Sequence, residues 1–181
     1  MSQTARWQPQ MWISLSSALI ALCALTFAIY QSLLQRQFLR LSVRPHMIIS
    51  FNYDNDGAGF MFGNTGMGYG TIKTFEVLVD GRPQPNWQEV CRTLGFASSP
   101  AFEFLVPYPE EVLKPDSVHR SFWMPYGPEA EELKLKKERI FVKVCYCSVF
   151  DECWKVDSRS GLPERVNQCP KPDIAFTAPP L

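Results

Sequence analysis

Four cysteines near the C-terminus are the residues whose type and spacing could do chemistry. Cys145, Cys147 and Cys153 lie in the stretch VCYCSVFDECW, and the fourth is Cys169. Cysteine sulfurs can bind a metal, exchange electrons or form disulfides. The spacing C-x-C-x5-C-x15-C contains neither a C-x-x-C redox pair nor the C-x2-4-C knuckle of structural zinc sites. Disulfides are therefore favoured, and inert thiols and a metal site stay open as alternatives.

The strand pattern around these cysteines predicts how they pair. Ile140–Ser148 alternates and is rich in β-branched and aromatic side chains, which is typical of a strand. SVFDE then forms a turn and CWKVD returns as the partner strand, so that Cys147 lies opposite Cys153, within disulfide reach. Cys145 shares a face with Cys147, and Cys169 lies beyond the return strand. We predict the disulfides Cys147–Cys153 and Cys145–Cys169.

The other residues with catalytic potential form no local motif. His46 and His119 are far apart in the sequence, and each is expected at the surface or at a strand end. Asp54–Gly57 (DNDG) lacks the ligand pattern of a calcium loop and is expected to form a turn. The glycine-rich stretch GNTGMGYG precedes a strand rather than a helix, so a turn or bulge with positive φ is expected instead of a phosphate site. We predict no catalytic residue, no cofactor and no metal ligand, although distant residues can assemble a site across the fold.

Composition points to a packed β domain. The chain has 18 basic and 18 acidic side chains, so no global field attracts nucleic acid, and we expect no nucleic-acid partner. Its 15 prolines and 10 glycines are spread along the chain, and 13% of the residues are aromatic. This combination is typical of many turns around a β core rather than of disorder.

The N-terminal segment is apolar enough to enter a membrane. From Trp7 to Gln35 there is no charged side chain. The 24 residues Met11–Leu34 would span about 36 Å as a helix, more than the ~30 Å hydrocarbon core of a bilayer. A cleaved signal peptide is the alternative, but the apolar run is longer than usual and lacks a small-x-small cleavage site. We predict an N-terminal tail at 1–10 and an uncleaved helix at 11–34 that binds the lipid bilayer.

Two physical arguments disagree about the side of the membrane that the domain occupies. Arg6 precedes the helix, whereas Arg36, Arg40 and Arg44 follow it. The positive-inside rule therefore places the C-terminal domain in the cytoplasm. Disulfides persist in oxidising compartments and favour the periplasm instead. We follow the cysteines and predict a single-pass protein of the cytoplasmic membrane with a periplasmic domain.

After a juxtamembrane linker at 35–45, residues 46–169 are predicted to form one antiparallel β-sandwich, immunoglobulin-like, with a partly open barrel as the alternative.

One short helix is expected at Pro85–Leu94, capped by Asn86 and ended by Gly95, with Cys91 on its buried face. Glu129–Glu138 is charged and compatible with a helix, and it is expected to be a solvated connection rather than a functional patch. Residues 170–181 are expected to form a proline-rich tail. Five to seven strands are expected, among them 47–53, 59–63, 71–79, 118–124 and a possible edge strand at 102–106.

Three stretches resemble one family. RLSVRPH after a single anchor, NTGMGYGTIKTFEVLVDG, and CYCSVFDECW are similar to a family of bacterial membrane-anchored proteins without established activity. The resemblance covers Leu41–Asp157. It implies a β-sandwich-like domain and adds no catalytic residue. The family's typical N-x-G-x-G-P-A stretch differs here, because Tyr69-Gly70 replaces Pro-Ala.

These observations favour a non-enzymatic role. We predict a membrane-anchored, non-catalytic interaction module of the bacterial cell envelope, with another envelope protein as its partner. Two alternatives stay open: a hydrolase or redox accessory protein with a cleft that the sequence does not reveal, and a cytoplasm-facing membrane sensor whose arginines contact anionic lipid.

Overall fold

The computed structural model describes residues 7–96 and 101–178, which form two units: one that ends at Ser42 and one that starts at Val43. The first unit is the helix α1 (Trp7–Ser42), which is longer at both ends than the predicted span. Its segment Gln10–Ser42 has the length and composition to cross a membrane, with a mean hydropathy of 2.1 in its most apolar window. Hydroxyls along it donate to carbonyls three or four residues earlier, as Ser14 does to Gln10 and Thr26 to Cys23, so the helix satisfies its own polar groups.

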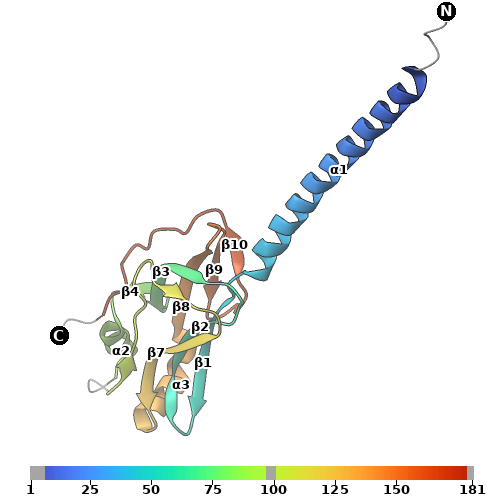
Figure 1. The fold of residues 1–181 in the computed structure, drawn as a ribbon. Helices are drawn as coiled ribbons and strands as arrows, with labels where there is room; N and C mark the ends of the chain where they lie inside the picture. Colours follow the sequence, from blue (N-terminus) through green and yellow to red (C-terminus); the bar gives the residue numbers. More distant parts are fainter. Residues whose placement is uncertain (1–6, 97–100, 179–181) are drawn as a thin grey trace, which may run out of the picture. The chain divides into compact units, whose positions relative to one another are not determined.

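The second unit consists of two antiparallel sheets (Figure 1). The first sheet has the order β1-β2-β7-β5, and the second β10-β9-β8-β3-β4, with β6 also paired to β3. The first contains β1 (Met47–Asp54), β2 (Gly57–Asn64), β5 (Glu103–Phe104) and β7 (Ser117–Pro125). The second contains β3 (Gly70–Val79), β4 (Arg82–Gln84), β6 (Val112–Leu113), β8 (Ile140–Ser148), β9 (Cys153–Asp157) and β10 (Glu164–Val166). The predicted two-sheet, mainly β fold is confirmed.

The core lies between the facing sides of the two sheets. Alternation along β3 turns Val77 and Val79 inward, and alternation along β8 does the same for Val142 and Val144. All four side chains are almost fully buried, and Phe60 packs with them from β2. Burying such side chains stabilises the fold by about 1.5–3 kcal/mol each before conformational entropy is subtracted. The core therefore explains why the sequence alternates on these strands.

Helix α2 (Trp87–Leu94) begins and ends as its sequence predicts. The Asn86 side chain accepts a hydrogen bond from the backbone N–H of Glu89, and Gly95 ends the helix with φ 77°. Trp87 is completely buried, with its ring stacked on Phe122 at 4.6 Å. The predicted helix is confirmed, and it carries one of the two tryptophans of the core.

A second short helix forms in the helix-compatible segment 129–138, as α3 (Pro128–Lys136) and the 3-10 turn η1 (Lys137–Arg139). The expectation that this segment is a solvated connection is wrong for two of its side chains. Ala130 and Leu133 lie three residues apart on α3, and both are completely buried in the core. Because only two side chains point inward, the surrounding charges hid this apolar face.

The proline-rich C-terminal segment packs against the domain. Phe176 is buried against Phe75 and Trp87, with ring centroids at 5.4 and 5.2 Å. The backbone N–H of Thr177 donates to the carbonyl of Pro85 at 2.8 Å. The domain therefore continues past the predicted boundary at Cys169, because a single aromatic side chain fixes the tail to the core.

Candidate functional site

The cysteine hairpin has the predicted geometry. The backbone N–H of Ser148 donates to the carbonyl of Glu152 at 2.8 Å and closes the turn between β8 and β9. Cys147 therefore lies opposite Cys153 in register, and the two are joined by a disulfide. Cys145 is bonded to Cys169 across 24 positions of sequence. Both pairings are those that the strand pattern predicts.

The two disulfides form one cluster of sulfur atoms. The sulfurs of Cys147 and Cys169, which belong to different disulfides, lie 4.0 Å apart. Those of Cys147, Cys153 and Cys169 all lie within 4.8 Å of one another, which would suit three thiolate ligands of a metal ion. In this structure all three sulfurs are in disulfide bonds and hence are not thiolates. The arrangement acts here as a covalent staple of the hairpin and the tail.

Beside the Cys145–Cys169 bond lies a polar hollow of about 390 Å³ over the outer face of β3, β8 and β9. Its charges are of both signs, and Lys155 pairs with Glu164 at 3.0 Å. Burial alone would raise the pKa of Asp157, but hydrogen bonds from the backbone N–H groups of Ser160 and Arg159 bring that pKa below its ordinary value. The carboxylate is thus used locally to close the turn after β9.

The glycine-rich stretch after β2 packs against residues 43–46, where the domain starts. The Asn64 side chain is completely buried, accepts from the backbone N–H groups of His46 and Gly66, and donates to the carbonyls of Gly68 and Leu113. All of its hydrogen-bonding groups are therefore used, which is the condition for burying an amide.

The positive φ angles that we expected in this stretch are absent. The positive-φ glycines of the described chain lie elsewhere, at Gly57, Gly81, Gly95 and Gly161. Instead, a Cβ atom on Gly68 would lie 1.5 Å from the Val43 carbonyl oxygen, and one on Gly66 would lie 2.4 Å from the His46 nitrogen. The expectation was wrong because these glycines are needed for close backbone approach rather than for turn geometry.

The candidate catalytic residues are not brought together. His46 is exposed just before β1, whereas His119 lies on β7, two strands away in the sheet. The imidazole of His119 packs on Phe62, with ring centroids at 5.7 Å. Neither histidine forms a hydrogen bond from its ring to a carboxylate or a cysteine within the described residues. The geometry therefore offers these two imidazoles no partner for acid–base chemistry.

Cys91 lies on the buried face of α2, as predicted. It is free but only 4% exposed. Burial raises the pKa of its thiol to about 12. Because the thiolate is the nucleophile, this side chain is unreactive at neutral pH. The other free cysteine, Cys23, belongs to α1.

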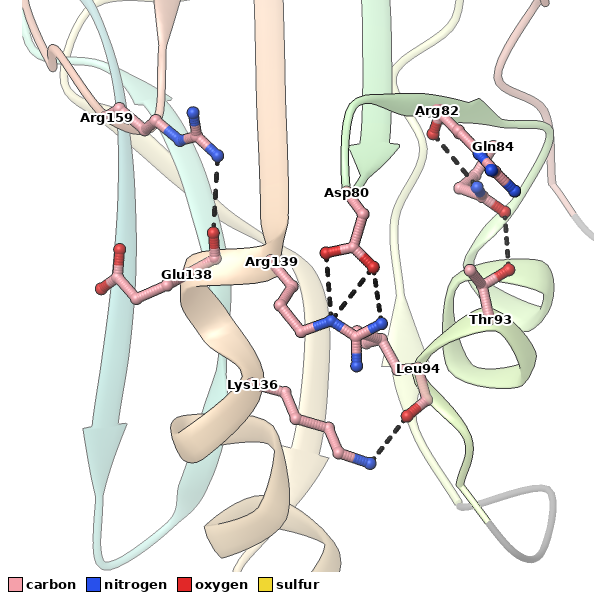
Figure 2. Close-up of polar contacts among 9 residues, drawn as sticks. All are labelled: Asp80, Arg82, Gln84, Thr93, Leu94, Lys136, Glu138, Arg139 and Arg159. Atoms are coloured by element: carbon pink, nitrogen blue, oxygen red, sulfur yellow. Dashed lines mark hydrogen bonds and ion pairs between the residues drawn. The ribbon is translucent and has the colours of Figure 1, made fainter.

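Most exposed charges have structural partners. Asp54 accepts from the backbone N–H groups of Asp56 and Gly57 in the β1–β2 turn, as expected for this DNDG stretch. The Arg139 guanidinium donates to both carboxylate oxygens of Asp80 in the turn after β3 (Figure 2), and it holds the pKa of Asp80 below its ordinary value. These pairs brace turns of the domain.

One edge of the first sheet is open. Among the described strands β1 pairs only with β2, and the backbone N–H of Thr65 donates to the His46 carbonyl. Since hydrogen-bonding groups alternate sides along a strand, the backbone groups of Ile49, Phe51 and Tyr53 point away from β2. Because Ile49 is only 6% exposed, the part of this edge that can accept another extended chain is the stretch from Phe51 to Tyr53. The residues Met47–Tyr53 contain neither a proline nor a charged side chain that would prevent pairing.

A groove of about 390 Å³ lies beside the middle of this edge. We call it the β1 groove, and it is lined by Phe51, Phe60, Lys137, Glu138, Ile140, Ser158 and Arg159. Figure 2 shows the guanidinium of Arg159 donating to the Glu138 carbonyl, while the Glu138 carboxylate points away from Arg139. The Lys137 ammonium lies 5.6 Å from the centre of the Phe51 ring. The groove thus has an aromatic floor and charged margins.

Sequence reasoning missed this groove. The alternating, uncharged pattern of residues 47–53 predicts a strand. That this strand lies at the edge of its sheet follows from the order of the strands, which the pattern does not specify. Lys137 and Arg159 reach the groove from a helical turn and from the turn after β9, and no sequence motif connects them to β1.

No protein-family model, curated protein or solved structure matches this chain.

Proposed function

We propose that this protein is a membrane-anchored, non-catalytic interaction module of the bacterial cell envelope, and that β1 receives an extended segment of another envelope protein. The observation that carries the proposal is the combination of the open β1 edge with the β1 groove. In strand addition the backbone provides affinity and alternate side chains enter pockets beside the edge. An added strand would place every second side chain over Phe51 and between Lys137 and Arg159.

The arrangement of possible nucleophiles and bases supports binding over catalysis. Cys91 is buried as a thiol, and the imidazoles of His46 and His119 lie two strands apart. The largest group of reactive side chains, the four C-terminal cysteines, is used in two disulfides. These disulfides also favour a periplasmic domain, since they persist in oxidising compartments. Arg36, Arg40 and Arg44 argue for the opposite orientation.

Site-specific photo-crosslinking tests the binding role. Phe51, in the β1 groove, is replaced by a photoreactive benzoyl-phenylalanine in the full chain. Tyr108, an exposed aromatic between β5 and β6 that does not line the groove, is replaced as the matched control. We expect one discrete adduct from position 51 and none from position 108 in host cells. A synthetic peptide of the crosslinked partner segment should bind the purified chain, and its backbone N-methylated form should not. Equal adducts from both positions, or none, would refute the proposal.

Thiol accessibility in intact cells tests the orientation. A cysteine at exposed Ser160 should react with a membrane-impermeant maleimide before lysis, whereas one at Ser2 should react only after lysis. The native Cys145, Cys147, Cys153 and Cys169 should resist alkylation until a reductant is added. The reverse pattern, with the four native cysteines free after lysis, would place the domain in the cytoplasm.

A further inference from the structure

Four large apolar side chains are exposed on two neighbouring loops of the domain. Met67 and Tyr69 lie between β2 and β3 and are 80% and 53% exposed; Val149 and Phe150 lie between β8 and β9 and are 62% and 43% exposed. We call this set the apolar rim. Clustered exposed apolar side chains mark interaction surfaces, whereas single ones are ordinary.

The sheet register places both loops at one end of the sandwich. Gly70, the first residue of β3, pairs with Ser148, the last residue of β8. Tyr69 just before β3 and Val149 just after β8 therefore lie at the same end of two adjacent strands. The loop that carries Met67 wraps the first residues of the domain, since a Cβ on Gly68 would meet the Val43 carbonyl oxygen. The apolar rim therefore lies at the end of the domain where Val43 begins, which we call the Val43 end.

Chain connectivity keeps the Val43 end close to the membrane. Val43 directly follows Ser42, the last residue of α1. Beyond the apolar span 11–34, the eight residues Gln35–Ser42 rise only about 12 Å as a helix. Headgroups occupy about 5–8 Å on each side of the hydrocarbon core. The distance available between the lipid headgroups and the Val43 end is therefore no more than a few side-chain lengths.

We infer that the apolar rim inserts into the headgroup region of the same membrane that α1 crosses, and this inference rests on the anchoring part of the proposed function. Tyr69 is a residue type that favours this interface, with an apolar ring and a polar tip. Arg36 and Arg40 follow the span and attract anionic headgroups. Asp151 and Glu152 border the rim and oppose that attraction, and Arg165 pairs with Glu152 at 3.1 Å. Apolar insertion rather than charge thus holds the rim on the lipid.

Membrane contact of the rim would orient the binding edge. β1 starts at Met47, near the Val43 end, and its eight residues extend about 27 Å along the sandwich. With the rim on the lipid, the β1 groove is presented above the headgroups, where a segment of another envelope protein can reach it.

Fluorescence quenching in lipid nanodiscs tests the inference on the full chain. Tyr69 is replaced by an encoded environment-sensitive fluorescent amino acid, and Tyr126 is replaced in a matched control. Tyr126 has a similar exposure of 59%, but its N–H bonds to the Asp56 carbonyl at the opposite end of the sandwich. The nanodiscs contain phosphatidylcholine and phosphatidylglycerol, with a nitroxide placed high on the acyl chain.

We expect quenching at position 69 to exceed that at position 126 by about threefold or more, since insertion brings the rim to the acyl boundary. The double variant Met67→Ser/Val149→Ser should lower the quenching at position 69 without unfolding, because both side chains are exposed. Equal quenching at the two positions, in chains that co-purify with nanodiscs, would overturn the insertion of the rim and leave the membrane anchor standing. Failure to co-purify would overturn the anchor as well.

Discussion

The C-terminal segment is attached to the domain at two points by two different means. At one point Cys169 is covalently bonded to Cys145 on β8. At the other, Phe176 is inserted between the rings of Phe75 and Trp87 without any covalent link. The two attachments are only seven positions apart in the chain, yet they respond to different conditions. The covalent attachment depends on the redox compartment, whereas the packed one depends on apolar burial alone.

Folding of the packed attachment therefore does not depend on the compartment, whereas formation of the covalent attachment does. The packed attachment forms in any aqueous compartment, and its neighbouring thiol, Cys91, is buried and unreactive. The covalent attachment contributes its stability only where disulfides persist. A reductant should therefore act on one region of the molecule and leave the other unchanged.

The largest expected effect is at the packed attachment. Trp87→Ala should lower the free energy of unfolding by about 3–5 kcal/mol, because Trp87 is completely buried among aromatic rings. Urea unfolding of the full chain in detergent, followed by near-ultraviolet circular dichroism, measures this with and without reductant. The loss should be equal in both. Trp87→Phe is the matched control and should cost much less. The buried indole N–H of Trp87 has no hydrogen-bond partner among the described residues, so its removal breaks no bond there.

Removal of the covalent attachment should come next. The double variant Cys145→Ser/Cys169→Ser should lose about 3 kcal/mol under oxidising conditions, because the bond closes a span of 24 positions. In a reductant the variant and the unchanged chain should unfold alike. A difference in the free energy of unfolding that persists in the reductant would show that the side chains, rather than the bond, stabilise this region. The distinction between a covalent and a packed attachment would then be wrong.

Close packing should matter even at the covalently stapled end of the domain. Gly68→Ala should cost about 1–3 kcal/mol, because its Cβ would lie 1.5 Å from the Val43 carbonyl oxygen and the backbone must move. Gly127→Ala is the control, since the nearest atom to a Cβ there is a flexible carboxylate oxygen of Glu129 at 3.5 Å. Equal unfolding free energies for the two variants would contradict the close-approach role of Gly68.

At neutral pH the smallest effect is that of the Cys91 thiol, because its contribution to stability changes only at pH values above about 9. Burial raises the pKa of this thiol from 9.0 to about 12, so between these values the folded state keeps a proton that the unfolded state releases. The unfolded state then binds fewer protons, and stability must fall as pH rises, by at most about 1.4 kcal/mol per pH unit. Cys91→Ala should flatten this decline. Parallel declines in the two proteins would mean that the thiol titrates freely in the folded domain.

Local rules predicted the elements that depend on neighbouring residues. Asn86 and Gly95 bound α2 because caps are formed by residues within one turn. The pairing of Cys147 with Cys153 followed from alternation and a short turn. The strands β4, β6 and β10, of two or three residues each, carried no such pattern, and the described chain has ten strands where five to seven were expected.

By itself the sequence determined the apolar helix, the alternating strands, the cap residues and the Cys147–Cys153 disulfide, because each is specified by side chains a few positions apart or by a strand's period of two. The tertiary structure alone decided that Phe176 and Leu133 belong to the core, that Gly68 must lie against Val43, and that β1 is an open edge beside Lys137 and Arg159. Each of these depends on contacts between segments far apart in the chain. Their positions follow from the order of strands in a sheet, which no local pattern encodes.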